Sequence, residues 1–387
     1  MKILTEHFTI LRYCGLWLPE GWTGSIKNIY HLFMLSMVFM YLSFSASCLM
    51  ELILSLKNIE DAVNSGVMTF TFLLVCAKII NLIFKRRGII KVCQYLEMDL
   101  CQPKNDKEEM IILESNLRAR GILKIFGLIV LGAVGSITCG SIIENMSMRA
   151  LAFNARLPYY NTGGFGFWIT YFHQHIGHAY GGVIGCTADS LFYGTLIHIC
   201  GQLKILKYRL SNYSDILKIA KKHNNLKINH DQDYEWKFIR DCVNHHLLII
   251  KLSNVTNDIF SFVIFLQFSL TVMILTVTIQ TMSKLSILSL KFLYTFLYFS
   301  CILGEIFFFC WYGNEVTLES LDIVKAISNG DWQSYTLNTQ KCLVIFMARA
   351  FTPIVFTSGH VVTLTLVSFN SLLKMSYSAY NLLSQVA

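Results

Sequence analysis

Long apolar runs alternate with charged segments along this chain, and the apolar runs are similar in length. A helix needs about 20 residues to cross the roughly 30 Å of hydrocarbon in a bilayer, and each run approaches or exceeds that length. The run from Tyr30 to Met50, for example, contains no charged residue. Seven spans are predicted, at residues 30–50, 67–84, 122–143, 165–200, 259–279, 286–311 and 358–385. The predicted fold class is an all-α membrane protein with seven transmembrane helices.

The charged segments between the spans keep the apolar periodicity of helices. In one of them Trp236, Ile239 and Val243 recur at intervals of three to four residues, which places them on one helix face. We therefore expect the helices to continue beyond the bilayer and to pack together there, within a single transmembrane domain covering residues 1–387. These cytoplasmic helical or anchor regions are predicted at residues 85–121, 201–258 and 312–356.

The composition agrees with a membrane protein, since 54% of the residues are hydrophobic and 14% are charged. Basic residues are unevenly divided between the two sides that seven spans define. The side that holds the N-terminus carries 24 Lys and Arg residues, whereas the other side carries 5. The positive-inside rule then places the N-terminus in the cytoplasm and the C-terminus outside the cell. This asymmetry explains the net charge of +8, so no nucleic-acid partner is predicted.

The sequence contains no arrangement of residues typical of an enzyme or a metal site. It lacks a P-loop, a nucleophile elbow and an HExxH motif. His173 and His178 lie about 140° apart on a helix, so they cannot hold a metal ion on one face. The 12 cysteines fall mostly in the spans or cytoplasmic segments and are expected to be small buried hydrophobes. No enzyme activity, cofactor or metal is predicted.

Three polar residues outside this pattern carry predictions of their own. Asn145 begins an Asn-Met-Ser sequon in a predicted outer loop, and we expect it to be glycosylated. Asp189 and Glu305 are isolated acids within apolar spans, where an unpaired charge is costly. Each acid is therefore expected to be paired or to face water, and Glu305 is a candidate to influence the passage of cations.

The last predicted helix carries one polar stripe on an otherwise apolar surface. At about 100° per residue, five polar side chains fall within an arc of roughly 80°. A membrane helix with one polar face either packs against polar partners or lines water, and we interpret this one as a pore helix. The stripe consists of Ser371, Lys374, Ser378, Asn381 and Gln385. A lysine is unusual in a pathway for cations, so the role of Lys374 stays open.

The C-terminal segment resembles the signature of insect odorant receptors. The order and spacing of the shared residues match over about 50 residues of this chain. These shared residues are Tyr335, Lys341, Arg349-Ala350, Pro353, Thr357, Gly359, Phe369, Lys374 and Ser376-Tyr377-Ser378. The rest of the chain agrees with the family in length, number of spans and the predicted location of the N-terminus.

This resemblance implies a seven-helix subunit that assembles as a tetramer around a central cation pore. In that family an odorant-tuned subunit pairs with a common co-receptor, and a small volatile apolar odorant opens the pore. The co-receptor has a much longer second cytoplasmic loop than this chain, so the chain resembles a tuning subunit. The implied location is the plasma membrane of olfactory sensory neurons, with the lipid bilayer and the co-receptor as partners.

The resemblance also implies where the gate and the ligand site lie. By position, Leu382, Gln385 and Val386 match the apolar constriction and polar ring at the outer end of the family's last helix, where apolar rings close a pore by dewetting. The family's ligand pocket lies between the second, third, fourth and sixth spans. Aromatic and hydroxyl side chains in the outer halves of these spans suit a small apolar ligand. The candidates are Phe70, Leu74, Ile137, Thr138, Tyr171, Phe172, His175, Tyr294 and Tyr298.

Arg349 lies in the short helix that precedes the last span. A charge at that position is costly in lipid, so we expect it in the cytoplasmic bundle where subunits anchor to one another. Three acids just upstream are its predicted salt-bridge partners. They are Glu315, Glu319 and Asp322.

Three alternatives are weighed against this interpretation. A gustatory-type receptor channel carries a Thr-Tyr start and a Gln-Phe finish to its last helix, and this chain has neither. A G-protein-coupled receptor also has seven spans, but its orientation is the opposite, and the DRY and NPxxY motifs do not occur here. A transporter is disfavoured because no internal repeat is detectable.

Overall fold

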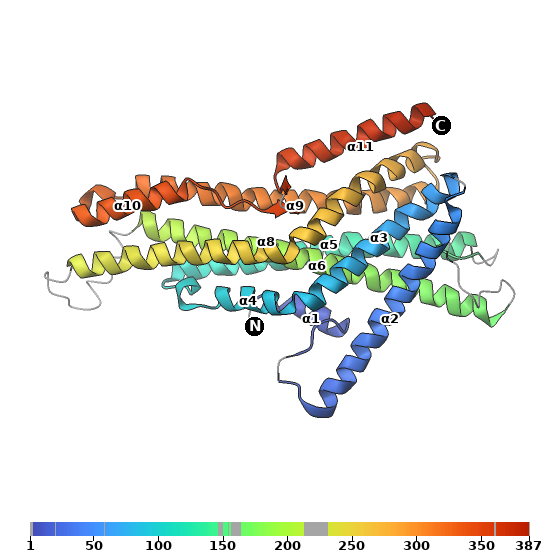
Figure 1. Ribbon diagram of the computed structural model, residues 1–387, viewed down its shortest axis with the longest axis horizontal. Helices are drawn as coiled ribbons and strands as arrows, with labels where there is room; N and C mark the ends of the chain where they lie inside the picture. Colours follow the sequence, from blue (N-terminus) through green and yellow to red (C-terminus); the bar gives the residue numbers. More distant parts are fainter. Residues whose placement is uncertain are drawn as a thin grey trace.

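Long helices lying side by side make up almost all of the molecule (Figure 1). The structure is a computed structural model that describes residues 3–19, 21–57, 59–145, 150–153, 155, 164–212, 231–359 and 361–386. The α-helices in these ranges are α1 (Thr5–Tyr13), α2 (Gly24–Ser55), α3 (Ile59–Phe84), α4 (Arg86–Leu96), α5 (Asp106–Asn145), α6 (Phe165–Ser211), α8 (Asp231–Ser283), α9 (Leu290–Asn329), α10 (Leu337–Ala350) and α11 (Leu366–Val386). Shorter elements are the 3-10 helices η1 (Asp99–Cys101) and η3 (Trp332–Ser334) and the strands β1 (Thr357–Ser358) and β2 (Val362–Thr363).

Six of the described helices are long and apolar enough to cross a membrane, namely α2, α3, α5, α6, α8 and α9. The prediction of an all-α membrane protein is confirmed at this level. α11 has 21 residues, which span about 31 Å at 1.5 Å per residue, but it is not among these six. The count of seven spans and the orientation of the termini therefore stay predictions.

Several helices extend well past the apolar runs that predicted them. α6 continues to Ser211 and α9 continues to Asn329, whereas their predicted spans end at residues 200 and 311. α9 also begins later than predicted, because Ser289 caps its N-terminus. The Ser289 hydroxyl accepts a hydrogen bond from the Phe292 amide at 3.1 Å. The charged ends of these helices are thus continuous with their apolar parts.

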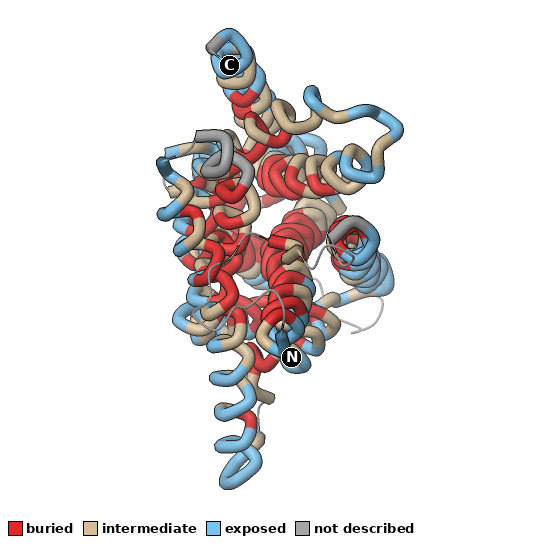
Figure 2. The backbone as a smooth tube through the Cα atoms, turned by 90° about the vertical axis from the view of Figure 1, so that its right-hand side faces the viewer, coloured by how far each residue is buried: buried red, intermediate tan, exposed pale blue. Residues whose placement is uncertain are grey.

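α6 is buried along most of its length. Figure 2 shows that the buried residues gather in the interior of the bundle. α6 contacts α1, α2, α3, α5, α8 and α9. Part of α2, by contrast, diverges from the other helices and exposes Ile29, Leu32 and Phe39 (Figure 1). Such an apolar exposed face suits contact with lipid. The core therefore follows α6, and the apolar exterior follows the outer helices.

A short hairpin joins α10 to α11 and determines where the last helix begins. β1 and β2 pair antiparallel, with Thr357 opposite Thr363. Between the strands Gly359 has a φ of +57°, and a Cβ at this position would lie 2.8 Å from the Phe265 ring of α8. Because this turn interrupts the helix, α11 begins at Leu366 and not near residue 358 as predicted.

The hairpin is held against both neighbouring long helices. The Gly359 amide donates a hydrogen bond to the Ser261 carbonyl of α8 at 3.0 Å. On the other side, Gly313 of α9 makes room for Leu364, because a Cβ at Gly313 would lie 2.7 Å from the Leu364 carbonyl oxygen. The base of α11 is therefore fixed between α8 and α9, and the rest of the helix continues beyond it (Figure 1).

Candidate ligand-binding site

A cavity of about 90 Å³ lies inside the bundle, between α2, α3, α5, α6 and α9. Most of the side chains that line it are apolar, among them Phe72 and Val75 of α3, Phe126 and Val130 of α5, and Ile302 of α9. A concave apolar wall with a few placed polar groups is typical of sites for small organic molecules. The cavity is therefore the candidate ligand-binding site.

One polar group of the cavity wall is a hydroxyl pair that joins α3 to α9. The hydroxyls of Thr71 and Tyr298 lie 2.6 Å apart. The Thr71 hydroxyl also donates to the Val67 carbonyl at 3.1 Å, so Tyr298 is the donor in the pair. Tyr298 thus presents its ring to the cavity while its hydroxyl has a partner.

The second polar feature of the cavity wall is a buried triad of charged side chains from three helices. The Lys78 ammonium of α3 donates to Asp189 Oδ2 of α6 at 2.8 Å and to Glu305 Oε1 of α9 at 2.6 Å. Each of the three side chains is at most 8% exposed. Tyr193 supports the arrangement by donating to the backbone carbonyl of Glu305 at 3.0 Å. We call Lys78, Asp189 and Glu305 the cavity triad.

The cavity triad is not balanced in charge when all its members are ionised. One ammonium faces two carboxylates, which leaves a formal charge of −1. Burying charge away from water is unfavourable unless opposite charge or hydrogen bonds compensate it. This end of the cavity is therefore suited to a positively charged group or to a donor of hydrogen bonds.

The pairing of Asp189 and Glu305 confirms the expectation that acids in apolar spans have a partner. Their shared partner, Lys78, was not predicted. Lys78 interrupts the apolar run at 67–84, and a buried lysine needs an acid just as a buried acid needs a cation. Matching the lysine to both acids was the signal that was missed.

The structure brings two of the nine predicted ligand-site residues to the cavity, Ile137 and Tyr298. Leu74 is buried elsewhere in the core, and Phe172 is 57% exposed. Tyr171 packs against the His175 ring at a tilt of 34°, with the centroids 4.2 Å apart. The remaining three are half-buried and are not among the lining residues; they are Phe70, Thr138 and Tyr294.

The polar stripe of α11 faces away from the rest of the chain. Leu372 and Ser376 are buried on the opposite face of the helix, where the Ser376 carbonyl accepts a hydrogen bond from Thr276 of α8 at 3.2 Å. Within the stripe Asn381 is half-buried and the other four residues are exposed; those four are Ser371, Lys374, Ser378 and Gln385. The chain therefore leaves the predicted pore face uncovered.

Of the predicted gate residues, Leu382 is 67% exposed and Gln385 is also exposed. The side chain of Val386 lies outside the described residues, although its backbone ends α11. The same holds for Asn145, which is the last residue of α5 and the predicted glycosylation site. The roles of Val386 in the gate and of Asn145 as a glycosylation site therefore stay predictions.

The predicted salt bridges of Arg349 are wrong, because its three proposed partners bind other cations. Arg349 itself is exposed on α10. Glu315 forms a two-pronged ion pair with Arg118 at 2.9 and 3.0 Å. Glu319 pairs with Lys207, and Asp322 pairs with Lys325 at 2.8 Å. These acids face α5, α6 or their own helix, so they hold the bundle together without Arg349.

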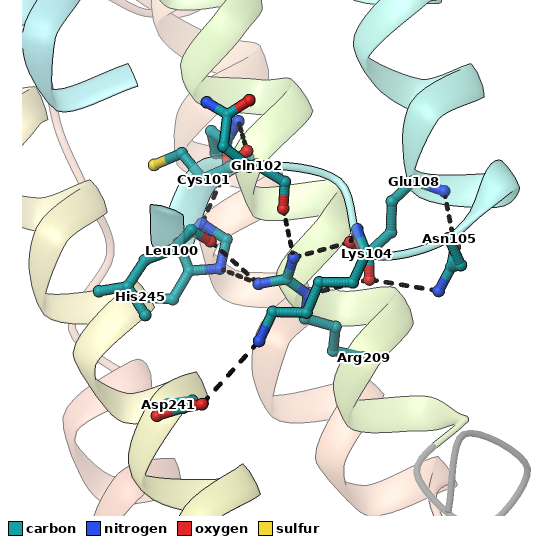
Figure 3. Close-up of polar contacts among 10 residues, drawn as sticks. Leu100, Cys101, Gln102, Lys104, Asn105, Glu108, Arg209, Asp241 and His245 are labelled. Carbon is teal, nitrogen blue, oxygen red and sulfur yellow. Dashed lines mark hydrogen bonds and ion pairs between the residues drawn. The ribbon is translucent and has the colours of Figure 1, made fainter. Parts of the chain in front are cut away.

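A second buried ionic cluster lies where α5, α6, α8 and η1 meet (Figure 3). Its centre is the Arg209 guanidinium, which donates from Nε and Nη2 to the two carboxylate oxygens of Glu108 at 2.9 and 2.7 Å. The other N–H groups meet the carbonyls of Leu100 and Gln102 at 3.0 and 3.1 Å, and His245 Nδ1 at 3.3 Å. All five guanidinium donors therefore have an acceptor.

The hydrogen bonds of this cluster continue beyond Arg209. Because His245 accepts at Nδ1, its Nε2 carries the proton and donates to Gln202 Oε1 at 2.9 Å. Gln202 in turn donates to the Cys101 carbonyl at 3.1 Å. Arg209 and Glu108 are 5% and 1% exposed and balance each other in charge. We call Arg209, Glu108, His245 and Gln202 the Arg209 cluster; it has no group left over for a ligand.

Comparison with known proteins gives one family. The family model described as 7tm odorant receptor matches residues 58–377. Odorant receptor 46a, isoform A, of Drosophila melanogaster is 22% identical over 350 residues, which cover 90% of this chain and 89% of that protein. Odorant receptor Or1 of Anopheles gambiae is 22% identical over 398 residues, covering 95% and 91% of the two chains.

The fold also matches a solved structure. The insect olfactory receptor OR5 from Machilis hrabei, in complex with eugenol, superposes with a TM-score of 0.84 at 17% sequence identity. The match covers 99% of this chain and 97% of that one. At this level of identity the likeness shows that the two chains share a fold.

Proposed function

The chain belongs to the 7tm odorant receptor family, and on that premise we propose that it is the ligand-tuned subunit of an odorant-gated cation channel. Its six apolar helices make it a multi-pass membrane protein. In the proposal a small volatile ligand enters the cavity, and α11 lines a central pore. The partners are co-receptor subunits of the same family in a heterotetramer, in the plasma membrane of olfactory sensory neurons.

The uncovered polar face of α11 is the observation that carries the channel proposal. Ser371, Ser378 and Gln385 are exposed on one side, while Leu372 packs into the chain on the other. A polar face exposed to hydrocarbon is unfavourable, so it needs water or polar partners. Four such helices around a common axis supply both, because their stripes then enclose a water-filled path.

The cavity is connected to α11 through α9. Tyr298 and Ile302 of α9 line the cavity, and Phe307 lies little more than one turn further along the same helix. The Phe307 ring contacts the Phe369 ring of α11, with centroids 5.5 Å apart. A ligand that moves α9 therefore moves the surface on which α11 rests. To open the pore, the ligand must bind the open arrangement more tightly than the closed one.

The proposed orientation places the N-terminus in the cytoplasm and the C-terminus outside. It follows from the excess of Lys and Arg on one side of the predicted spans. A G-protein-coupled receptor has the opposite orientation. Epitope tags at each end, stained in cells with intact membranes, separate the two. Staining of an N-terminal tag and not of a C-terminal tag contradicts the channel orientation.

Currents test the channel proposal directly. The chain is co-expressed with an odorant receptor co-receptor, and whole-cell currents are recorded during a panel of volatiles. We expect ligand-evoked cation currents, and we expect Leu382→Ser to raise the leak or change the permeability ratio of Na⁺ to K⁺, because it makes the apolar constriction wettable.

Leu293→Ser is the matched control for this change. Leu293 is also an exposed leucine, but it lies on α9, away from the proposed pore. Currents that match the wild type in Leu382→Ser, at equal surface expression, remove Leu382 from the gate. No current from any volatile, at normal surface expression with the co-receptor, rejects the channel proposal.

A further inference from the structure

We propose that the cavity binds a small primary alkylammonium ion, with its charged group held by the carboxylates of Asp189 and Glu305. The inference names the chemical class of ligand for the proposed receptor site, and it rests on the proposed function for the consequence that binding opens a pore. Binding itself is a property of the cavity and is tested separately.

The charge at one end of the cavity is the first reason. Among the described residues that line the cavity, Lys78, Asp189 and Glu305 form one ionic group, and their formal charges sum to −1 when all three are ionised. His178 also lines the cavity, but it precedes Asp189 by 11 residues on α6, about 16 Å along the helix. The excess negative charge is thus local, and a cation in the cavity balances it.

The geometry of the triad favours an ammonium over a metal ion. Lys78 already shows the contact that an ammonium makes here, with N–H···O distances of 2.8 and 2.6 Å to the two carboxylates. A Mg²⁺ or Ca²⁺ ion prefers six or more oxygen ligands. This cavity offers two carboxylates, and most of the side chains around them are apolar. A primary ammonium needs only a few acceptors and brings an alkyl chain that suits the apolar wall.

The volume of the cavity limits the ligand to a few atoms. A cavity of roughly 150 Å³ in another protein binds benzene, which has six non-hydrogen atoms. By proportion, 90 Å³ accommodates about four. Propylammonium has that size, with one nitrogen for the carboxylates and three carbons for the side chains of Val75, Phe126 and Ile302.

Thermal unfolding of the purified full-length chain in lipid nanodiscs tests the inference. Propylamine, propan-1-ol and propionate are compared at pH 7.5, since they have nearly the same size but carry positive, zero and negative charge. We expect propylamine to raise the Tm by about 2–5 °C at saturation, and the other two to leave it unchanged. An equal rise with propan-1-ol overturns the inference, and so does no rise with propylamine.

Two variants locate the effect at the triad. Glu305→Gln makes the triad neutral, so it should lose the propylamine shift; a shift that survives in this variant overturns the proposed site. Lys78→Ala removes the resident ammonium, so propylamine should stabilise this variant more than the wild type by taking its place. A propylamine shift in Lys78→Ala no larger than that of the wild type also counts against the site. This second variant serves if Glu305→Gln does not fold.

The outcome is distinct from that of the channel experiment. If propylamine stabilises the wild type and not Glu305→Gln, while no volatile evokes a current, the channel proposal fails and the ligand class stands. If neutral volatiles evoke currents and propylamine shows no charge-dependent stabilisation, the channel proposal stands and the ligand class fails.

Discussion

The described part of the chain contains two buried ionic clusters that are built from the same kinds of side chain but differ in whether their charges balance. In the Arg209 cluster one cation meets one carboxylate, and backbone carbonyls and His245 accept the remaining donors. In the cavity triad one cation meets two carboxylates next to a cavity. Burial is similar in both, since every member of the Arg209–Glu108 and Lys78 pairs is at most 8% exposed.

The difference teaches how to tell a structural ion pair from a candidate site. Burial alone does not distinguish them. A structural pair is balanced and leaves no donor over, because each unsatisfied buried group costs free energy. An unbalanced group beside a cavity keeps that cost until a ligand or a proton compensates it. The Arg209 cluster holds the junction of four elements (Figure 3), whereas the cavity triad lies in the wall of the cavity.

Breaking the Arg209 cluster should have the largest effect on stability. Arg209→Ala leaves the Glu108 carboxylate buried without its cation, and Glu108→Gln leaves Arg209 without its anion. Each should lower the free energy of unfolding by about 3–5 kcal/mol. The measurement is the yield of folded protein and the Tm in detergent.

The control for these variants is Lys325→Ala, which removes an ion pair whose lysine is 79% exposed. A surface pair contributes little, so this change should stay within about 0.5 kcal/mol. If Arg209→Ala is as mild as this control, the Arg209 cluster does not hold the fold together.

Glu305→Gln tests whether the cavity triad is really unbalanced. Removing one of its two carboxylates leaves a Lys78–Asp189 pair with no net charge, so the free energy of unfolding should change by no more than about 1 kcal/mol. Lys78→Met should cost about 3 kcal/mol, because two carboxylates then remain buried without a cation. If Glu305→Gln lowers the free energy of unfolding as much as Glu108→Gln does, the cavity triad is balanced in charge like the Arg209 cluster.

The buried imidazole of His7 on α1 should affect stability less than the loss of Arg209 or Lys78 does. Burial against α6 lowers the pKa of His7 from 6.5 to about 4. The unfolded chain then binds more protons between these values, so stability is fully present above about pH 6.5 and falls as the pH decreases. Between pH 7 and pH 5 the loss should be about 2 kcal/mol.

The control for this prediction is His7→Leu, which keeps a buried side chain but cannot be protonated. Its Tm should fall less than that of the wild type between pH 7 and pH 5, and the difference isolates His7 from other histidines. Parallel decreases in the two proteins show that His7 does not titrate on unfolding in this range.

Much of the helical architecture was predictable, because apolar runs of membrane length are a local signal. The polar stripe of α11 was also predictable, since its spacing is a property of one helix. The start of α11 was not, because the turn at Gly359 depends on contact with Phe265 of α8. The continuation of α6 and α9 past the membrane-length runs follows the helical periodicity of the charged segments, which is again a local signal.

The residues that line the cavity were harder to predict than the helices that surround it. Ile137 and Tyr298 line it, but the seven other candidates, which lie on α3, α5, α6 and α9, do not. Helix rotation decides which side chains point inward, and a nearly all-apolar helix has no polar face from which to read that rotation. The cavity triad joins residues 111 and 227 positions apart, so only the folded chain shows that one lysine serves both acids.

The base of α11 is held in place by its neighbours, so the helix moves by tilting about that base. Gly359 and Gly313 hold the segment before Leu366 against α8 and α9, so a displacement of the far end requires a tilt about that fulcrum. Leu382 lies 16 residues beyond Leu366, about 24 Å along the axis. A tilt of about 10° carries Leu382 sideways by about 4 Å. In the proposed assembly, a small rotation at the hairpin therefore becomes a larger change in pore diameter at the level of Leu382.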